Sequence, residues 1–266
     1  MERPIFSQLF SQQFISLLVT VSVGVAIIPS LPVRAEKSSS QQKTRVTVAF
    51  QPPPGEGMPN RTAGGASRTG NSCPSLSADK SDLTALVPAL EKPNGIGSSL
   101  TGLTTEATPT FYFFVPAIAA TEGVFSLKDE NDQDVYQTRL SVSGKAGIVS
   151  VKLPSDAPPL KVGQSYRWSF GLVCQAESSQ QQPEVVFVTG EIRRVEADVA
   201  LSDQLQQLTP LEQAAVYAEN GIWFDSIQIL ANLRQTQPNN SMLASQWEEL
   251  LKSVELEEIA KQPFID

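Results

Sequence analysis

Acidic side chains are the residues whose chemistry and spacing come closest to a catalytic pattern in this chain. The densest group near the C-terminus contains Glu248, Glu249, Glu257 and Glu258. Two facing carboxylates can hydrolyse a glycosidic bond, so a carboxylate-based enzyme acting on envelope glycans is one hypothesis. Adjacent residues of a helix do not face each other, however, which excludes Glu248 and Glu249 as a pair. The pattern favours a solvated helix face.

A second acidic group occupies the segment from Asp129 to Asp134, which offers side-chain oxygens at alternate positions, as calcium loops do. Such loops need Gly at their sixth position and Glu at their twelfth, where this chain has Asp134 and Leu140. The segment therefore predicts a hairpin tip in solvent, and we expect no metal ligands here.

The chain contains no histidine. This absence excludes a histidine general base, the Ser-His-Asp and Cys-His arrangements, and any histidine-ligated metal. We therefore predict a protein that is not an enzyme, with no catalytic, cofactor-binding or metal-binding residues and no cofactor.

The first 35 residues have the features of a signal peptide. Residues 14–28 form an uncharged apolar run, which is shorter than the roughly 20 residues that a membrane span needs. We predict cleavage after Ala35 and a periplasmic or extracellular mature protein. A short retained membrane anchor is the alternative. No second long apolar run follows, so we expect no stable membrane span after processing.

Export would place the two cysteines, Cys73 and Cys174, in an oxidising compartment. We predict a disulfide between them, closing a loop of roughly 100 residues that is worth about 4–5 kcal/mol in the chain-entropy model. Two buried free thiols are the alternative, and a mass measurement distinguishes the two.

The charge balance limits the partners. The chain has 20 Lys and Arg against 28 Asp and Glu, a net charge of −8, and no basic run longer than Arg193-Arg194. This composition argues against binding to nucleic acid or to an anionic membrane surface. We expect a protein or another envelope component as the partner.

Residues 36–80 predict a flexible arm, because they are rich in Pro, Gly and Ser and poor in large apolar side chains. Only Val46–Phe50 could form a strand. The arm also contains two arginines and two glycines that could form a small anion-binding loop, Arg61, Gly64, Gly65 and Arg68. A plain flexible linker is the other interpretation.

Residues 81–196 predict a β-sheet domain of about seven short strands separated by turns rich in Gly, Pro and Asp. In residues 166–174 the even positions are apolar and share one face, which places Cys174 in the core. The pattern predicts an immunoglobulin-like antiparallel β-sandwich. Phe111–Val115 and Val185–Val188 are apolar on both faces, so we expect downstream helices to cover that sheet.

Residues 197–266 predict a small helical bundle packed on the sandwich, which makes the chain an α+β protein. Thr209, Pro210 and Glu212 form a helix start signal, and Asn220-Gly221 forms a stop signal. Residues 222–235 form the next helix, and Ser241 is expected to cap another.

Residues 210–240 resemble a single tetratricopeptide-type helical hairpin, at Tyr217, Ala218, Gly221, Trp223, Asp225, Leu230, Leu233 and Pro238. A peptide-binding array needs about three such repeats, and no second copy follows. We therefore expect the Trp223 face to close the sandwich, and any peptide to use the exposed side with Gln228, Asn232 and Gln235.

Several blocks of residues in a particular order carry a broader resemblance. They include Arg61–Arg68 with Cys73, Phe113–Pro116, Tyr166–Phe170 ending at Cys174, and Tyr217–Asp225 with Trp247. From about residue 60 to the end, the chain resembles the cyanobacterial domain-of-unknown-function family 928. The resemblance implies an exported cyanobacterial protein and brings no activity.

We predict an exported, non-catalytic interaction or scaffold module of the cell envelope. Besides the carboxylate-based enzyme, a third hypothesis is a small-ligand sensor with its site between sandwich and helices, near Trp168 or Trp223. Trp223 lies at a core position of its helix, which favours packing over ligand binding.

Overall fold

The computed structural model describes residues 46–60, 82–91, 98–174 and 185–265. These described residues all belong to one compact unit. Within these described ranges, ten strands come first along the chain, and the helices follow.

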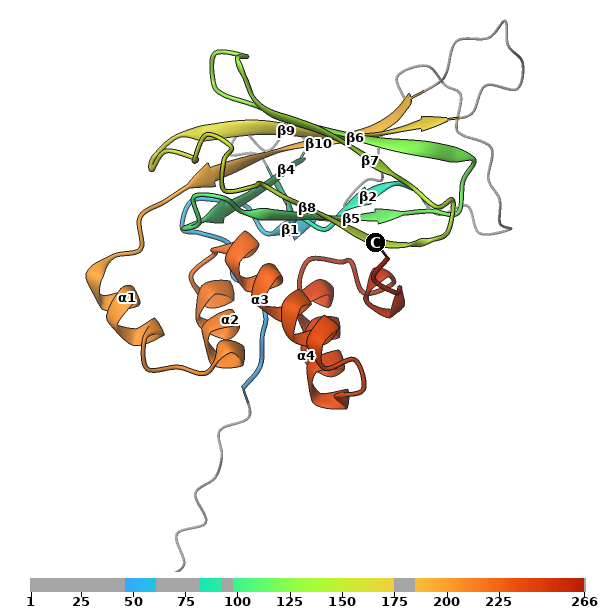
Figure 1. Ribbon diagram of the computed structural model, residues 1–266. Coiled ribbons are helices and arrows are strands. Elements are labelled where there is room, and N and C mark those ends of the chain that lie inside the picture. The colour runs from blue at the N-terminus through green and yellow to red at the C-terminus, as the bar shows by residue number, and fades with distance from the viewer. Residues whose placement is uncertain (1–45, 61–81, 92–97, 175–184, 266) are drawn as a thin grey trace, which may run out of the picture. The chain divides into compact units, whose positions relative to one another are not determined.

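The strands form two sheets that lie face to face (Figure 1). The larger sheet contains, in spatial order, β1 (Pro59–Asn60), β3 (Ala89–Glu91), β4 (Ser98–Thr104), β10 (Val185–Arg194), β9 (Ser165–Cys174), β6 (Ala120–Lys128) and β7 (Asp134–Ser141). The smaller sheet contains β2 (Thr84–Ala85), β5 (Thr110–Val115) and β8 (Gly147–Lys152). The predicted α+β class with a sandwich-like arrangement is confirmed.

The alternation in β9 shows why these residues form a sandwich. Every even position from Tyr166 to Cys174 is at most 4% exposed, so one face of the strand lies in the core. Across the sandwich, the Phe113 ring stacks on Phe170 with 4.3 Å between ring centroids. The prediction of one continuous inner face is confirmed.

The immunoglobulin-like topology is not confirmed. Immunoglobulin sandwiches divide their strands four and three, whereas this molecule has a seven-stranded and a three-stranded sheet. β10 also pairs with β4 in parallel, from Glu191 opposite Thr101 to Arg194 opposite Thr104. β1 to β3 are two or three residues long, too short for a period-2 pattern to reveal them.

Four α-helices and a 3-10 turn follow the strands. They are α1 (Val199–Leu205), α2 (Pro210–Glu219), α3 (Trp223–Thr236), α4 (Ser241–Lys252) and η1 (Ile259–Lys261). The predicted capping box at Thr209 and Glu212 is present, and Gly221 ends α2 with a φ of 72°. The N-cap of α4 is Asn240 and not Ser241, because Asn240 Oδ1 accepts from the N–H groups of Met242 and Leu243 in the first turn.

The helices cover the smaller sheet (Figure 1). All six residues of β5 are buried, and α3 contacts both β5 and β4. Phe111 packs inside the sandwich against Phe125 and also reaches Phe224 of α3, with ring centroids 4.9 and 5.3 Å away. The predicted helical cover over Phe111–Val115 is confirmed.

For Val185–Val188 the same prediction is wrong. Val185 is 44% exposed, and Val186 and Phe187 are only half-buried. β10 belongs to the larger sheet, whereas the helices lie on the side of the smaller one (Figure 1). The sequence pattern shows that both faces of a strand are apolar but does not show to which sheet the strand belongs.

Part of the predicted arm lies against the helices. The Val48 N–H donates to Gln246 Oε1 at 2.8 Å, and the Phe50 N–H donates to Ser253 Oγ at 2.9 Å. Phe50 also meets Trp223 edge-on at 5.4 Å. Residues 46–50, which could have formed a strand, belong to neither sheet. The side chains of Gln246 and Ser253 accept from two of their backbone N–H groups instead.

Candidate functional site

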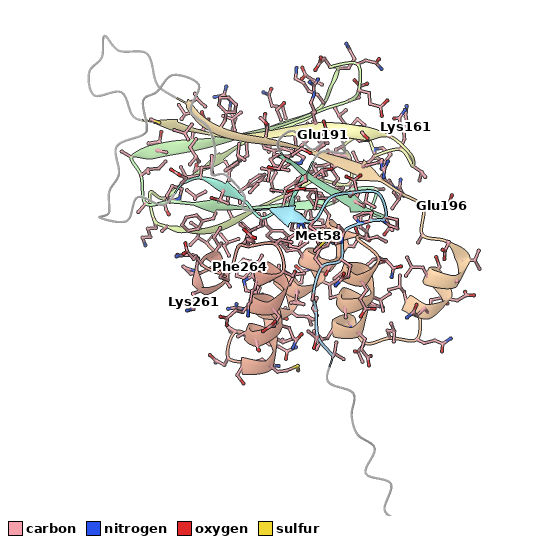
Figure 2. All side chains as sticks on the ribbon, turned by 180° about the vertical axis from the view of Figure 1, so that it is seen from behind. Met58, Lys161, Glu191, Glu196, Lys261 and Phe264 are labelled. Atoms are coloured by element: carbon pink, nitrogen blue, oxygen red, sulfur yellow. The ribbon has the colours of Figure 1, made fainter. Side chains whose placement is uncertain are left out.

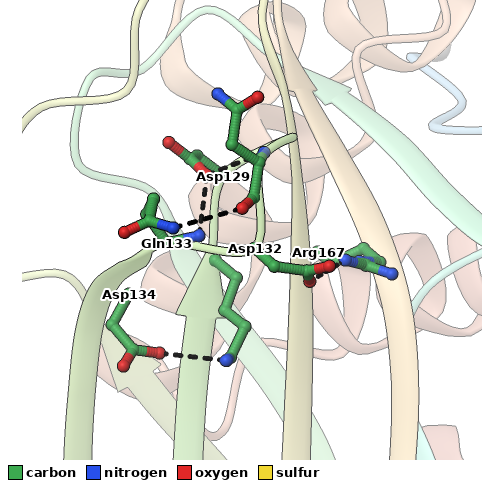
Figure 3. A network of polar contacts seen from close by, with 7 residues as sticks. Asp129, Asp132, Gln133, Asp134 and Arg167 are labelled. Atoms are coloured by element: carbon green, nitrogen blue, oxygen red, sulfur yellow. Dashed lines mark hydrogen bonds and ion pairs between the residues drawn. The ribbon is translucent and has the colours of Figure 1, made fainter.

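The aspartates of the hairpin tip between β6 and β7 bind nearby groups of the protein itself (Figure 3). Asp129 Oδ1 accepts from the N–H groups of Asn131 and Gln133, each at 2.9 Å. Asp132 pairs with Arg167, and Asp134 lies 3.3 Å from Lys128. The oxygens that resembled calcium ligands thus have separate partners, and the described residues contain no cluster of three metal-ligating side chains.

The four C-terminal glutamates, Glu248, Glu249, Glu257 and Glu258, are all exposed. Glu248 and Glu249 lie on the solvent side of α4, whose opposite face buries Trp247 and Leu250. The placement agrees with the solvated face that the sequence favours.

The predicted disulfide and anion loop fall mostly outside the described part of the chain. Cys174 ends β9 and is 3% exposed, as its position in the alternating pattern indicates. Cys73 and the loop residues Arg61, Gly64, Gly65 and Arg68 lie outside the described residues. The disulfide and the loop therefore stay predictions.

Both tryptophans considered for ligand binding are core residues. Trp223 is fully buried, and its Nε1 donates to the Leu86 carbonyl at 2.8 Å. Trp168 is 1% exposed and packs against Phe113 at 5.7 Å between ring centroids. The packing interpretation of Trp223 is confirmed.

A buried carboxylate near the start of α3 forms what we call the Asp225 anchor, made of Asp225, Thr104 and Thr105. Asp225 is 3% exposed, and its Oδ2 accepts from Thr104 Oγ1 at 2.7 Å. The Thr105 N–H donates to the same carboxylate at 3.1 Å, and the Thr105 hydroxyl donates to Oδ1. The anchor ties α3 to the end of β4.

Burial controls the protonation of the Asp225 anchor. Desolvation raises the pKa of the Asp225 carboxyl to about 6, although the hydrogen bonds from Thr105 and Thr104 lower it. Burial also raises the pKa of the neighbouring Tyr217 phenol. Both carboxylate oxygens of Asp225 accept hydrogen bonds from Thr104 or Thr105 inside the protein, so we assign the anchor to holding the fold together.

The opposite end of α3 borders an open groove of about 530 Å³, which we call the Arg234 groove. Its walls come from β7, β8, the end of α3 and the C-terminal segment. The lining residues are Leu140, Ile148, Val149, Ser150, Arg234, Gln235, Pro238, Gln262, Pro263, Phe264 and Ile265.

Arg234 is the one charged residue among the described residues that line the groove. Its guanidinium lies 6.0 Å from the Trp247 ring centroid, and Nη1 donates to the Ala260 carbonyl at 3.3 Å. Partial burial lowers the pKa of this guanidinium, which stays protonated because arginine does not lose its proton in proteins. The groove therefore carries one fixed positive charge.

The C-terminal segment builds one wall of the groove by pairing with β8. The Ile148 N–H donates to the Pro263 carbonyl at 2.7 Å, and the Ile265 N–H donates to the Ile148 carbonyl at 2.9 Å. A Cβ at Gly147 would lie 2.7 Å from the Ile265 side chain, so this position needs glycine for the approach. Phe264 lies between the sheet and the helices (Figure 2), with Trp247 5.4 Å away.

The three residues predicted to form a peptide-binding surface, Gln228, Asn232 and Gln235, have different surroundings in the structure. Gln228 is not free, because its Oε1 accepts from the Thr110 N–H at 3.1 Å. Asn232 and Gln235 are exposed, and Gln235 lines the Arg234 groove. The sequence pattern includes Asp225 only as a position of the helical hairpin and gives no prediction for Arg234. The sequence signals that could have identified these two residues are an acid in the first turn of the helix and a base in its last turn.

A comparison with protein families assigns the chain to one family. The model of a domain of unknown function, DUF928, matches residues 63–264. The chain belongs to the DUF928 family. The DUF928 match extends over the Asp225 anchor and every residue of the groove lining except Ile265.

No curated protein matches this DUF928 chain. Within the described part of the DUF928 chain, none of the helices combines the length and the apolar character that crossing a membrane requires.

Proposed function

We propose that this DUF928 protein is an exported, non-catalytic binding module of the cell envelope whose ligand site is the Arg234 groove. The observation that carries the proposal is the groove itself. Its volume of about 530 Å³ lies within the range of about 300–1,000 Å³ typical of small-molecule sites. Apolar side chains line most of it, with a few polar groups between them.

The lining supports binding rather than catalysis. Ser150 is the one hydroxyl among the described residues that line the groove, and none of these residues is a carboxylate, a thiol or a second cation. A serine nucleophile needs an adjacent general base, which this lining does not provide. The exposed glutamates of α4 do not reach the groove lining, so the carboxylate-based enzyme gains no support.

The position of the groove favours the small-ligand hypothesis over a purely structural scaffold. It lies between a sandwich strand, β8, and the helical part of the chain, as that hypothesis expected. The residues of the groove are not the ones that hypothesis named. Arg234 and Phe264 line it, whereas Trp168 and Trp223 do not. The core packing of both tryptophans leaves them no surface for a ligand.

Export and the disulfide belong to the same proposal. The apolar run of residues 14–28, the segment ending at Ala35 and the pair of cysteines support it. The mature protein from the exported fraction should begin at Glu36 and lack two hydrogen masses relative to its reduced form. An intact N-terminus or two alkylatable thiols in the intact-mass spectrum would contradict these parts of the proposal.

Ligand binding is tested by native mass spectrometry of the mature protein incubated with a small-molecule extract of the source cells. Ser150 is exposed and lines the groove, so Ser150→Phe should fill it and remove the adduct that the wild type retains. Thr189→Phe, at an exposed position on β10 outside the lining, is the matched control and should keep the adduct. An adduct that persists in Ser150→Phe would place the ligand elsewhere.

A further inference from the structure

We propose that the Arg234 groove binds a monocarboxylate with an apolar body, whose carboxylate pairs with the Arg234 guanidinium. This inference rests on the proposed function and adds the chemical class of the ligand. It follows from the charge of Arg234, from its unused donors and from the apolar walls around it.

The charge of Arg234 has no acidic partner within the described residues. Arg139 pairs with Glu122 at 2.9 Å, Arg167 pairs with Asp132, and Lys128 pairs with Asp134. All three pairs lie at the surface, where water screens the charge and such a pair contributes little. Arg234 is more enclosed, and among the described residues its guanidinium donates to one acceptor, the neutral carbonyl of Ala260.

The geometry of Arg234 leaves donors for a ligand. An arginine carries five N–H donors in a planar fork, and the Ala260 carbonyl takes one of them. The Trp247 ring lies beneath the group at 6.0 Å, which restricts the side chain without using its donors. A carboxylate can accept two parallel N–H bonds from such a fork.

The walls define the rest of the ligand. Seven of the eleven lining residues have apolar side chains without any polar group, namely Leu140, Ile148, Val149, Pro238, Pro263, Phe264 and Ile265. An apolar body placed there gains from leaving water. One cation balances one negative charge, so we assign a monocarboxylate rather than a phosphate, which carries up to two charges at neutral pH.

The test compares octanoate with octanamide, which has the same chain and no charge, in ligand-observed NMR titrations of the mature protein. We expect octanoate to bind at least about ten-fold more tightly, in line with the strength of charge-assisted hydrogen bonds. Arg234→Gln should lower the affinity for octanoate to that for octanamide and so remove this preference. Arg234→Lys keeps the charge and should retain part of the preference.

The outcomes separate this inference from the proposed function. If both compounds bind the wild type equally and Ser150→Phe abolishes both, the groove binds ligands but the carboxylate assignment is overturned. If neither compound binds while native mass spectrometry shows an adduct that depends on Ser150, the proposed function stands and the ligand class is wrong. A preference for octanoate that persists in folded Arg234→Gln also overturns the inference.

Discussion

The two ends of α3 carry opposite charges in opposite surroundings. Near its start, Asp225 is 3% exposed and accepts hydrogen bonds from Thr104 and Thr105. Near its end, Arg234 is half-buried at an open groove and bonds one neutral carbonyl. The first charge has its hydrogen-bonding capacity used by the protein, whereas the second retains most of its own.

This difference separates a structural charge from a binding charge on one helix. Both charges agree in sign with the helix dipole, which favours an acid in the first turn and a base in the last. The dipole therefore does not distinguish them. What distinguishes them is whether the opposing element offers partners: the end of β4 does so for Asp225, and the groove walls do not for Arg234.

The largest effect is expected for Asp225→Ala. The substitution leaves the Thr105 N–H and two hydroxyls without their acceptor in a buried site, and should lower the free energy of unfolding by about 3 kcal/mol at pH 5. Urea denaturation measures it. Asp203→Ala, at an exposed position of α1, is the matched control and should stay within about 0.5 kcal/mol of the wild type. Equal stability of the two variants would break the comparison.

The second prediction concerns pH. The pKa of Asp225 is raised from 3.8 to about 6 in the folded protein, so the folded state holds this proton more tightly than the unfolded state. Its contribution to stability is therefore greatest below pH 4 and is lost as the pH rises through 6. The wild type should lose about 2 kcal/mol more than Asp225→Asn between pH 4 and pH 7. Parallel pH profiles of the two proteins would contradict this.

Thr104→Val should have a smaller effect, about 1 kcal/mol, because it removes one hydroxyl while keeping the side-chain shape. That hydroxyl donates to Asp225 and accepts from the Glu106 N–H at 3.0 Å. In the double variant with Asp225→Ala the two losses should not add, since both remove the same hydrogen bond. Denaturant titration of the four proteins measures the coupling, and additive losses would show that the anchor is not one unit.

The smallest effect on stability is expected for Arg234→Gln. The substitution removes one hydrogen bond and a distant ring contact at a half-buried site. The free energy of unfolding, measured by urea denaturation, should therefore fall by no more than about 0.5 kcal/mol. A loss as large as that of Asp225→Ala would mean that Arg234 also serves the fold. A small loss of stability with a lost preference for octanoate would sharpen the contrast between the two ends of α3.

Local patterns predicted much of the fold. The capping box at Thr209 and the turn at Gly221 are confirmed because their interactions lie within four residues of each other in the chain. The buried face of β9 is confirmed because alternation along a strand is also a local property. The parallel pairing of β4 with β10 was missed, since it joins residues far apart in the chain and has no period of its own.

The candidate sites show the same limit. The acids of the hairpin tip and of α4 form candidate patterns because they are adjacent in sequence. The structure leaves the glutamates of α4 exposed and pairs the acids of the tip with neighbouring groups. The Arg234 groove combines residues from β7, β8, α3 and the C-terminal segment, which no spacing in the sequence brings together. Its one sequence signal was a base in the last turn of a helix.

The sequence by itself determined the absence of histidine chemistry, the acidic charge, the strand and helix periods and the helix ends, because composition and short-range hydrogen bonding require no knowledge of distant residues. Only the tertiary structure decided which sheet the helices cover and which charge on α3 would be buried with partners. Burial and pairing depend on which surface a side chain contacts in the folded protein. For Asp225 that surface is the end of β4, more than a hundred residues away in the chain, where Thr104 and Thr105 donate to its carboxylate.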